Sequence, residues 1–63
     1  MLSKESCVIF LNKNVRLERN LDNHIEERFG ILMEVNDIDL VIEFKGRVQI
    51  YDLSSLCSIR EAF

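Results

Sequence analysis

The stretch from Ile31 to Leu53 alternates apolar and polar residues, with breaks at two turn-forming pairs, Asn36–Asp37 and Lys45–Gly46. Alternation with a period of two places successive side chains on opposite faces of a β-strand. Asn, Asp and Gly tolerate the positive φ angles that tight hairpin turns require. We therefore predict a three-stranded antiparallel meander over this stretch, and a mainly β fold.

Loop length sets the predicted register, because a shift of one residue inverts every side chain of a strand. A two-residue Asn36–Asp37 loop pairs Val35 with Ile38 and turns the apolar set of both strands towards one face. A two-residue loop at Lys45–Gly46 would instead place apolar residues opposite polar ones. We therefore predict a three-residue loop there, Lys45–Arg47, which places apolar residues opposite one another.

The N-terminal third reads as a hairpin, in which Cys7–Leu11 pairs with Val15–Glu18 around three polar residues. Leu21, Ile25 and Phe29 then recur every fourth position, which is typical of one face of a helix. Gly30 fits the position just after a helix end.

The tail, residues 54–63, is ambiguous. A tight helical turn followed by a strand over Cys57–Glu61 is the first interpretation, and a single C-terminal helix is the alternative.

Together these elements predict a single domain over residues 1–63. We expect a small five-stranded antiparallel SH3-like or Sm-like barrel with a short helical insertion near residues 22–29. The predicted core consists of Ile9, Leu11, Val15, Leu17, Ile31, Met33, Val35, Ile38, Leu40, Ile42, Phe44, Val48 and Ile50.

Composition excludes several classes of protein. Hydrophobic residues make up 48% of the chain, which argues against disorder. The net charge of −3 argues against nucleic acid as a partner. Two cysteines 50 positions apart allow a disulfide, but we favour free thiols in a reducing compartment. No metal-ligand spacing and no apolar run of membrane-spanning length occurs, so we predict a cytoplasmic protein without cofactors.

Catalytic residues are not indicated. His24 has no cysteine or serine partner at a readable spacing, and Glu26, Glu27 and Asp52 are typical of a solvated surface. The only basic cluster contains Lys13, Arg16 and Arg19, without interleaved aromatic residues. We therefore expect no enzymatic activity and only weak binding of nucleic acid.

The predicted register places Leu32, Val41 and Tyr51 side by side on the outer face of the meander. Either the chain's own tail or N-terminus covers this apolar ladder, or a partner does. Glu34 and Asp39 are predicted to lie opposite each other, near Glu43, as an acidic rim.

These features favour a small non-enzymatic protein–protein interaction module, acting as a regulator or inhibitor of a larger intracellular protein. Its partner would be another protein or identical subunits. The alternative is an Sm-like oligomeric RNA-binding protein that uses Lys13, Arg16 and Arg19.

Overall fold

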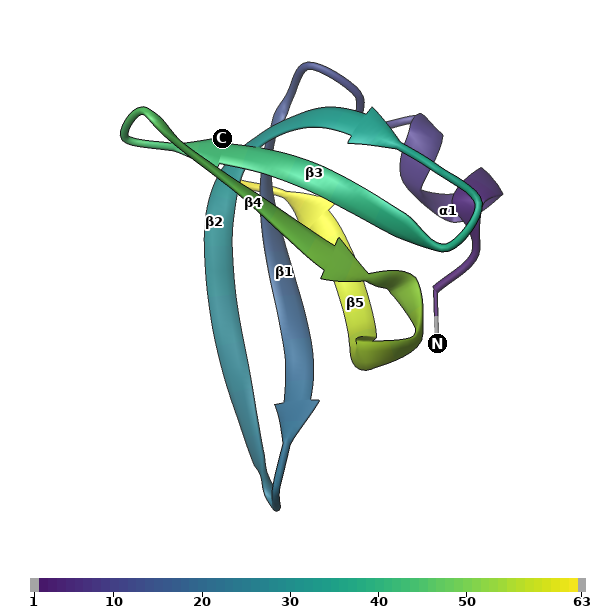
Figure 1. Ribbon diagram of the computed structural model, residues 1–63, viewed down its shortest axis with the longest axis vertical. Coiled ribbons are helices and arrows are strands. Elements are labelled where there is room, and N and C mark those ends of the chain that lie inside the picture. The colour runs from purple at the N-terminus through teal and green to yellow at the C-terminus, as the bar shows by residue number, and fades with distance from the viewer. Residues whose placement is uncertain (1, 63) are drawn as a thin grey trace.

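A short helix and five antiparallel strands make up the computed structural model, which describes residues 2–62 (Figure 1). The strands form one sheet in the order β4-β3-β2-β1-β5. The mainly β prediction is confirmed, but the sheet is not closed into a barrel. In chain order the elements are α1 (Lys4–Val8), β1 (Asn14–Leu21), β2 (His24–Val35), β3 (Asp39–Phe44), β4 (Arg47–Asp52), the 3₁₀ turn η1 (Leu53–Ser55) and β5 (Leu56–Glu61).

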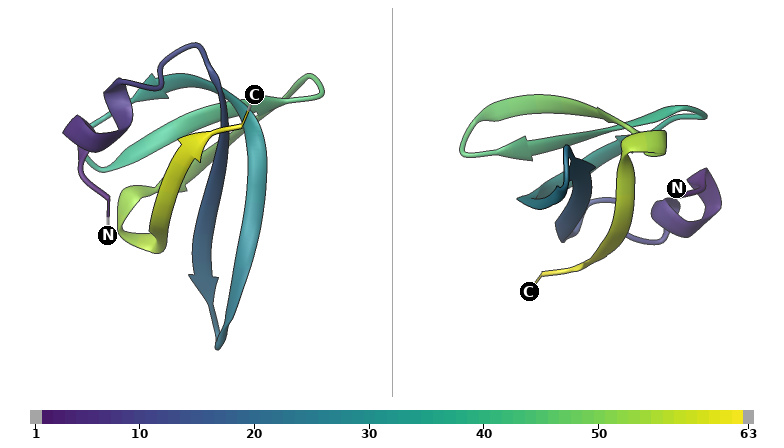
Figure 2. Two further views of the ribbon diagram at one scale, coloured as in Figure 1. Left: turned by 180° about the vertical axis from the view of Figure 1, so that it is seen from behind. Right: turned by 90° about the horizontal axis from the view of Figure 1, so that it is seen from below.

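The sheet bends strongly, so that the β3–β4 hairpin lies over β1 and β5 (Figure 2). The long strand β2 belongs to both parts: residues 24–31 pair with β1, and residues 31–35 pair with β3. Gly30 lies where β2 passes from one partner to the other. A Cβ atom on Gly30 would lie 2.6 Å from the carbonyl oxygen of Glu43, so only glycine allows this close approach.

The helical insertion predicted near residues 22–29 is wrong. Asp22 and Asn23 form a two-residue hairpin turn with φ angles of 38° and 72°, and β2 begins directly after it. A spacing of four residues fits a strand as well as a helix, because four is a multiple of two. Gly30 is accordingly a strand residue at a bend and not a helix cap.

The strand predicted over Cys7–Leu11 is also wrong. Residues 4–8 form α1, which begins with a capping box between Ser3 and Ser6. Cys7 on this helix is fully buried. An apolar run this short does not distinguish a strand from a helix.

The tail follows the first interpretation, since η1 leads into a strand, β5.

Cys7 and Cys57 are free, as expected. No helix among residues 2–62 is long and apolar enough to span a membrane.

The turn at Lys45–Gly46 contains two residues, not the three predicted. Both have positive φ angles, 52° and 78°, and Phe44 pairs directly with Arg47. This register turns β4 over relative to the prediction, so that Tyr51 points into the core while Val48 and Ile50 point outwards. The loop between β2 and β3 is also longer than predicted, and a bulge at Met33 shifts the register between these strands.

The core lies on the inner, concave face of the sheet. Four predicted core residues are buried there: Val15, Leu17, Leu40 and Ile42. Two more, Ile31 and Val35, are half-buried. The other seven are exposed, which corrects the prediction for Ile9, Leu11, Met33, Ile38, Phe44, Val48 and Ile50. Their places are taken by Cys7, Leu32, Tyr51, Leu53 and Leu56.

Replacing Gly30 by Ala tests the bend. Because the new methyl group would contact the Glu43 carbonyl, we expect a loss of about 1–3 kcal/mol of stability in urea unfolding. Gly46→Asn is the matched control, since no atom lies within 4 Å of a Cβ there and Asn tolerates a positive φ. Equal losses in the two variants would contradict the close approach at Gly30.

Neighbouring residues of β2 test the register. Leu32 is fully buried and Met33 is 47% exposed, although the sequence predicted the reverse. We expect Leu32→Ala to lower the free energy of unfolding by about 2–5 kcal/mol and Met33→Ala to change it by less than about 0.5 kcal/mol. If Met33→Ala lost more unfolding free energy than Leu32→Ala, the result would support the register predicted from the sequence instead.

Candidate functional site

The outer face of the meander formed by β2, β3 and β4 carries a group of exposed apolar side chains that the register brings together. Val41 on β3 lies between Glu34 on β2 and Ile50 on β4. Ile50 is 65% exposed and Val48, two residues earlier on the same face, is 64% exposed. Met33 follows buried Leu32 on β2 and is 47% exposed, so alternation places it on this side as well. We call Met33, Val41, Val48 and Ile50 the outer patch.

Four carboxylates surround the outer patch. Glu43 lies opposite Val48, and Asp39 lies opposite Asp52 at the other end of the hairpin. The side-chain amide of Asn36 donates to both Glu34 and Asp39, at 3.0 Å and 2.8 Å, and so holds two of these acids in place. We call Glu34, Asp39, Glu43 and Asp52 the acidic rim.

No basic side chain among residues 2–62 forms a salt bridge that would neutralise the acidic rim. Among residues 2–62, no salt bridge involves any of these four carboxylates. Six of the eight basic side chains form salt bridges with other carboxylates, and the remaining two, Lys45 and Arg47, lie at the β3–β4 turn. Carboxylates placed this close repel one another and favour a positively charged neighbour.

The predicted ladder of Leu32, Val41 and Tyr51 does not exist as a surface. Leu32 is fully buried and Tyr51 is only 6% exposed, because the two-residue turn and the bulge reverse their faces. Val41 does lie on the outer face, half-buried between its neighbours.

The predicted acidic residues Glu34, Asp39 and Glu43 also lie on the outer face. Glu34 and Asp39, however, are not opposite each other as predicted. They pair with Val41 and Asp52 respectively.

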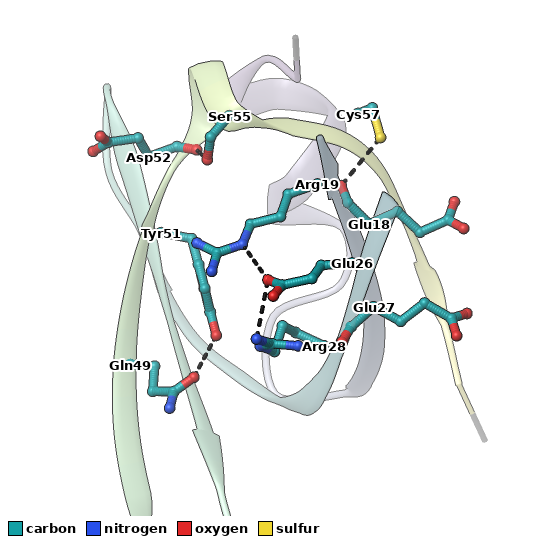
Figure 3. Close-up of polar contacts among 10 residues, drawn as sticks. All are labelled: Glu18, Arg19, Glu26, Glu27, Arg28, Gln49, Tyr51, Asp52, Ser55 and Cys57. Atoms are coloured by element: carbon teal, nitrogen blue, oxygen red, sulfur yellow. Dashed lines mark hydrogen bonds and ion pairs between the residues drawn. The ribbon is translucent and has the colours of Figure 1, made fainter. Parts of the chain in front are cut away.

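A polar cluster that the sequence did not reveal occupies the inner face near the far end of the β1–β2 hairpin (Figure 3). Glu26 on β2 accepts a hydrogen bond from Arg19 Nε at 2.8 Å and lies 3.0 Å from Arg28 Nη2. The Arg19 guanidinium also lies 5.0 Å from the centre of the Tyr51 ring, a cation–π contact. Tyr51 in turn donates to Gln49.

The polar cluster lies beside the Tyr51 ring. Its two guanidiniums share one carboxylate, so Glu26 already supplies the anion that they would otherwise attract. The hydrogen bond from Arg19, and then the charge of Arg28, lower the pKa of Glu26 below its ordinary 4.5. The pKa of Glu18 is also lowered, mainly by a hydrogen bond from the Ser58 hydroxyl at 2.5 Å. Both interactions stabilise the fold only while the carboxylates are ionised.

The basic residues of the RNA-binding alternative do not form a free positive surface. Arg16 is paired with Glu18 and Glu27, Arg19 with Glu26, and Lys13 with Glu61. Each cation that would contact a phosphate is therefore already neutralised by a carboxylate.

No group of three His, Cys, Asp or Glu side chains within residues 2–62 is placed to hold a metal ion. A hollow of about 670 Å³ lies between the start of α1 and the loops at Ile38 and Leu53. Lys4 and Asp37, which form an ion pair at 3.3 Å, are among the residues that line it.

Comparisons with known proteins give no relative: no protein-family model, no curated protein and no solved structure matches the chain.

Acid titration tests the polar cluster. Because the pKa of Glu26 is lower in the folded than in the unfolded chain, its contribution is present above about pH 4.5 and is lost as the pH falls through the folded value. We expect Glu26→Gln to be less stable than the wild type at neutral pH and to lose less stability on acidification. Urea unfolding from neutral pH to about pH 3 measures both effects. Parallel pH profiles for the two proteins would contradict a lowered pKa of Glu26 in the folded chain.

Proposed function

We propose that this chain is a non-enzymatic protein–protein interaction module that binds its partner through the outer face of the β2–β3–β4 meander. The observation that carries the proposal is the exposure of Val48 and Ile50, two β-branched apolar residues on one strand beside Val41. A 63-residue chain has little apolar surface to spare, and exposed apolar patches with polar rims are typical of interaction sites.

The acidic rim defines the chemistry of the partner. Four carboxylates without basic partners in the described chain attract a surface that carries lysine or arginine around an apolar centre. If two copies of this chain met through their outer faces, the four carboxylates of one copy would lie against the four of the other and would repel them. A different protein therefore fits this surface better than a second copy. By covering a basic site of a larger protein, the domain would act as a regulator or inhibitor.

The alternative, an Sm-like RNA-binding protein, has less support. Five antiparallel strands in a strongly bent sheet are consistent with a fold of the SH3-like or Sm-like kind. The cations Lys13, Arg16 and Arg19, however, are all paired with carboxylates, and the net charge is negative. Both features weaken attraction to a phosphate backbone.

Two substitutions on the outer face test the proposal. Val41→Glu places a charge in the centre of the outer patch, and Glu34→Lys reverses one charge of the acidic rim. Truncation or disruption of central interface residues typically costs about 2 kcal/mol or more, so we expect each variant to lose its partner at least about thirtyfold. Circular dichroism should show an unchanged fold, because both positions are outside the core.

Glu5→Lys is the matched control, since Glu5 is exposed on α1 and also forms no salt bridge among the described residues. Proteins captured from lysate by the wild type and by Glu5→Lys, but by neither outer-face variant, would support the proposal. The same proteins captured by Val41→Glu, or lost after nuclease treatment, would contradict it.

A further inference from the structure

A second hollow, of about 360 Å³, lies between β4 and the β1–β2 hairpin. Its lining consists of five residues: Arg19, Arg28, Gln49, Ile50 and Tyr51. Figure 3 shows four of them, of which Gln49 and Tyr51 come from β4 and the two arginines come from the two strands of the hairpin. Among residues 2–62, two guanidiniums and no carboxylate line this hollow, although the chain as a whole carries a net charge of −3.

The charge balance of the polar cluster leaves room for a second anion. Arg19 and Arg28 together carry two positive charges, and Glu26 supplies one negative charge for both. The lowered pKa of Glu26 keeps its carboxylate ionised at neutral pH. One positive charge therefore remains. Beside the low-dielectric protein interior, a guanidinium attracts an anion more strongly than it does in open water.

The two guanidiniums are held in place before any ligand arrives. Arg19 Nε donates to Glu26 at 2.8 Å, and the same guanidinium lies 5.0 Å from the centre of the Tyr51 ring. Arg28 Nη2 lies 3.0 Å from Glu26, and Arg28 Nη1 donates to the backbone carbonyl of Glu27 at 2.8 Å. Side chains that are already fixed lose little rotamer freedom on binding, which favours affinity.

The same contacts occupy acceptors and leave donors available. Arg19 is fixed through Nε, so its two terminal nitrogens have no hydrogen-bond partner among residues 2–62. The Tyr51 hydroxyl donates to the side-chain carbonyl of Gln49, so the amide nitrogen of Gln49 keeps its two donors for another partner. A hollow that offers mainly donors suits a ligand that offers acceptors.

We propose that this hollow binds a small monocarboxylic acid with an apolar body. A planar carboxylate matches the planar guanidinium fork through two parallel hydrogen bonds. Its single negative charge balances the one positive charge that remains, whereas a phosphate dianion would bring an excess. Ile50, which is 65% exposed, and the Tyr51 ring supply apolar surface for the rest of the ligand.

The size of the hollow also suits a small molecule. Ligand sites in proteins commonly have volumes of about 300–1,000 Å³. At about 360 Å³, this hollow lies near the lower end of that range. The site is distinct from the surface proposed for the protein partner, with which it shares only Ile50, and it does not rest on that proposal.

NMR titration of the isotope-labelled chain with phenylacetate tests the proposal. The side-chain signals of Arg19 Nε–H and of the Gln49 amide should shift and saturate, with a Kd on the order of 1 mM for a ligand this small. The side-chain amide of Asn36, which is bonded to two carboxylates of the acidic rim, should not shift. Phenylacetamide has the same ring without the charge, so it should bind at least about tenfold more weakly.

Arg28→Gln removes the remaining positive charge but keeps the pair of Arg19 and Glu26. We expect this variant to bind phenylacetate at least about tenfold more weakly than the wild type. Arg60→Gln is the matched control, because it makes the same change of charge on β5, away from the residues that line the hollow. Circular dichroism checks the fold of both variants.

Several results would overturn the proposal. One is the absence of a saturable shift of the Arg19 and Gln49 signals up to about 50 mM phenylacetate. Others are equal affinity for phenylacetamide, equal weakening in Arg28→Gln and Arg60→Gln, or tighter binding of inorganic phosphate than of phenylacetate.

Gln49→Glu provides a second variant if Arg28→Gln fails to fold. Gln49 is exposed on β4, and the substitution replaces its donors by a carboxylate at the wall of the hollow. Phenylacetate binding should then be lost, and unchanged binding would also overturn the proposal. Because phenylacetate is titrated into the isolated chain, failure here and failure of the outer-face proposal are distinguishable.

Discussion

The two-residue turn at Lys45–Gly46 is the constraint on which the surface of this protein depends. Two successive residues with positive φ angles connect strands whose twist matches the turn, and Gly46 adopts its angle of 78° without steric cost. This turn makes Phe44 the partner of Arg47 and fixes every later pair of the β3–β4 hairpin. As a consequence, the Tyr51 side chain lies in the core and the Ile50 side chain lies on the outer face.

Local turn geometry here outweighs hydrophobic alternation. Alternation alone would bury Val48 and Ile50, and the cost of exposing them is offset in part by the burial of the larger Tyr51. The exposure of Val48 and Ile50, and with it the outer patch, is therefore a result of the register that this turn sets.

Sequence reasoning found the parts of the fold in which local and tertiary preferences agree. In β3, alternation correctly identified Leu40 and Ile42 as core, and a helical turn before a strand was the first interpretation of the tail. It failed where a spacing was ambiguous. The fourfold spacing of Ile25 and Phe29 fits either a helix or one face of a strand, and the short run at Cys7 fits either a strand or a helix.

The candidate site was predicted in part for the same reason. Val41 and Glu43 lie on β3, whose alternation is reliable, and both are on the outer face as expected. Leu32 and Tyr51 lie on the neighbouring strands, where a bulge and a short turn reverse the face. The bulge at Met33 has no sequence signal, but the Lys45–Gly46 pair does, since its residues suit a two-residue turn.

The most direct measurement is the pattern of NMR contacts between α-protons across the β3–β4 hairpin. Non-hydrogen-bonded pairs bring their α-protons closest, and the two-residue turn makes Val41–Ile50 and Glu43–Val48 such pairs. Strong contacts within these two pairs are the predicted result. Contacts that pair Ile42 with Ile50 and Phe44 with Val48 would show a three-residue loop, would return Ile50 to the core and would contradict the outer patch.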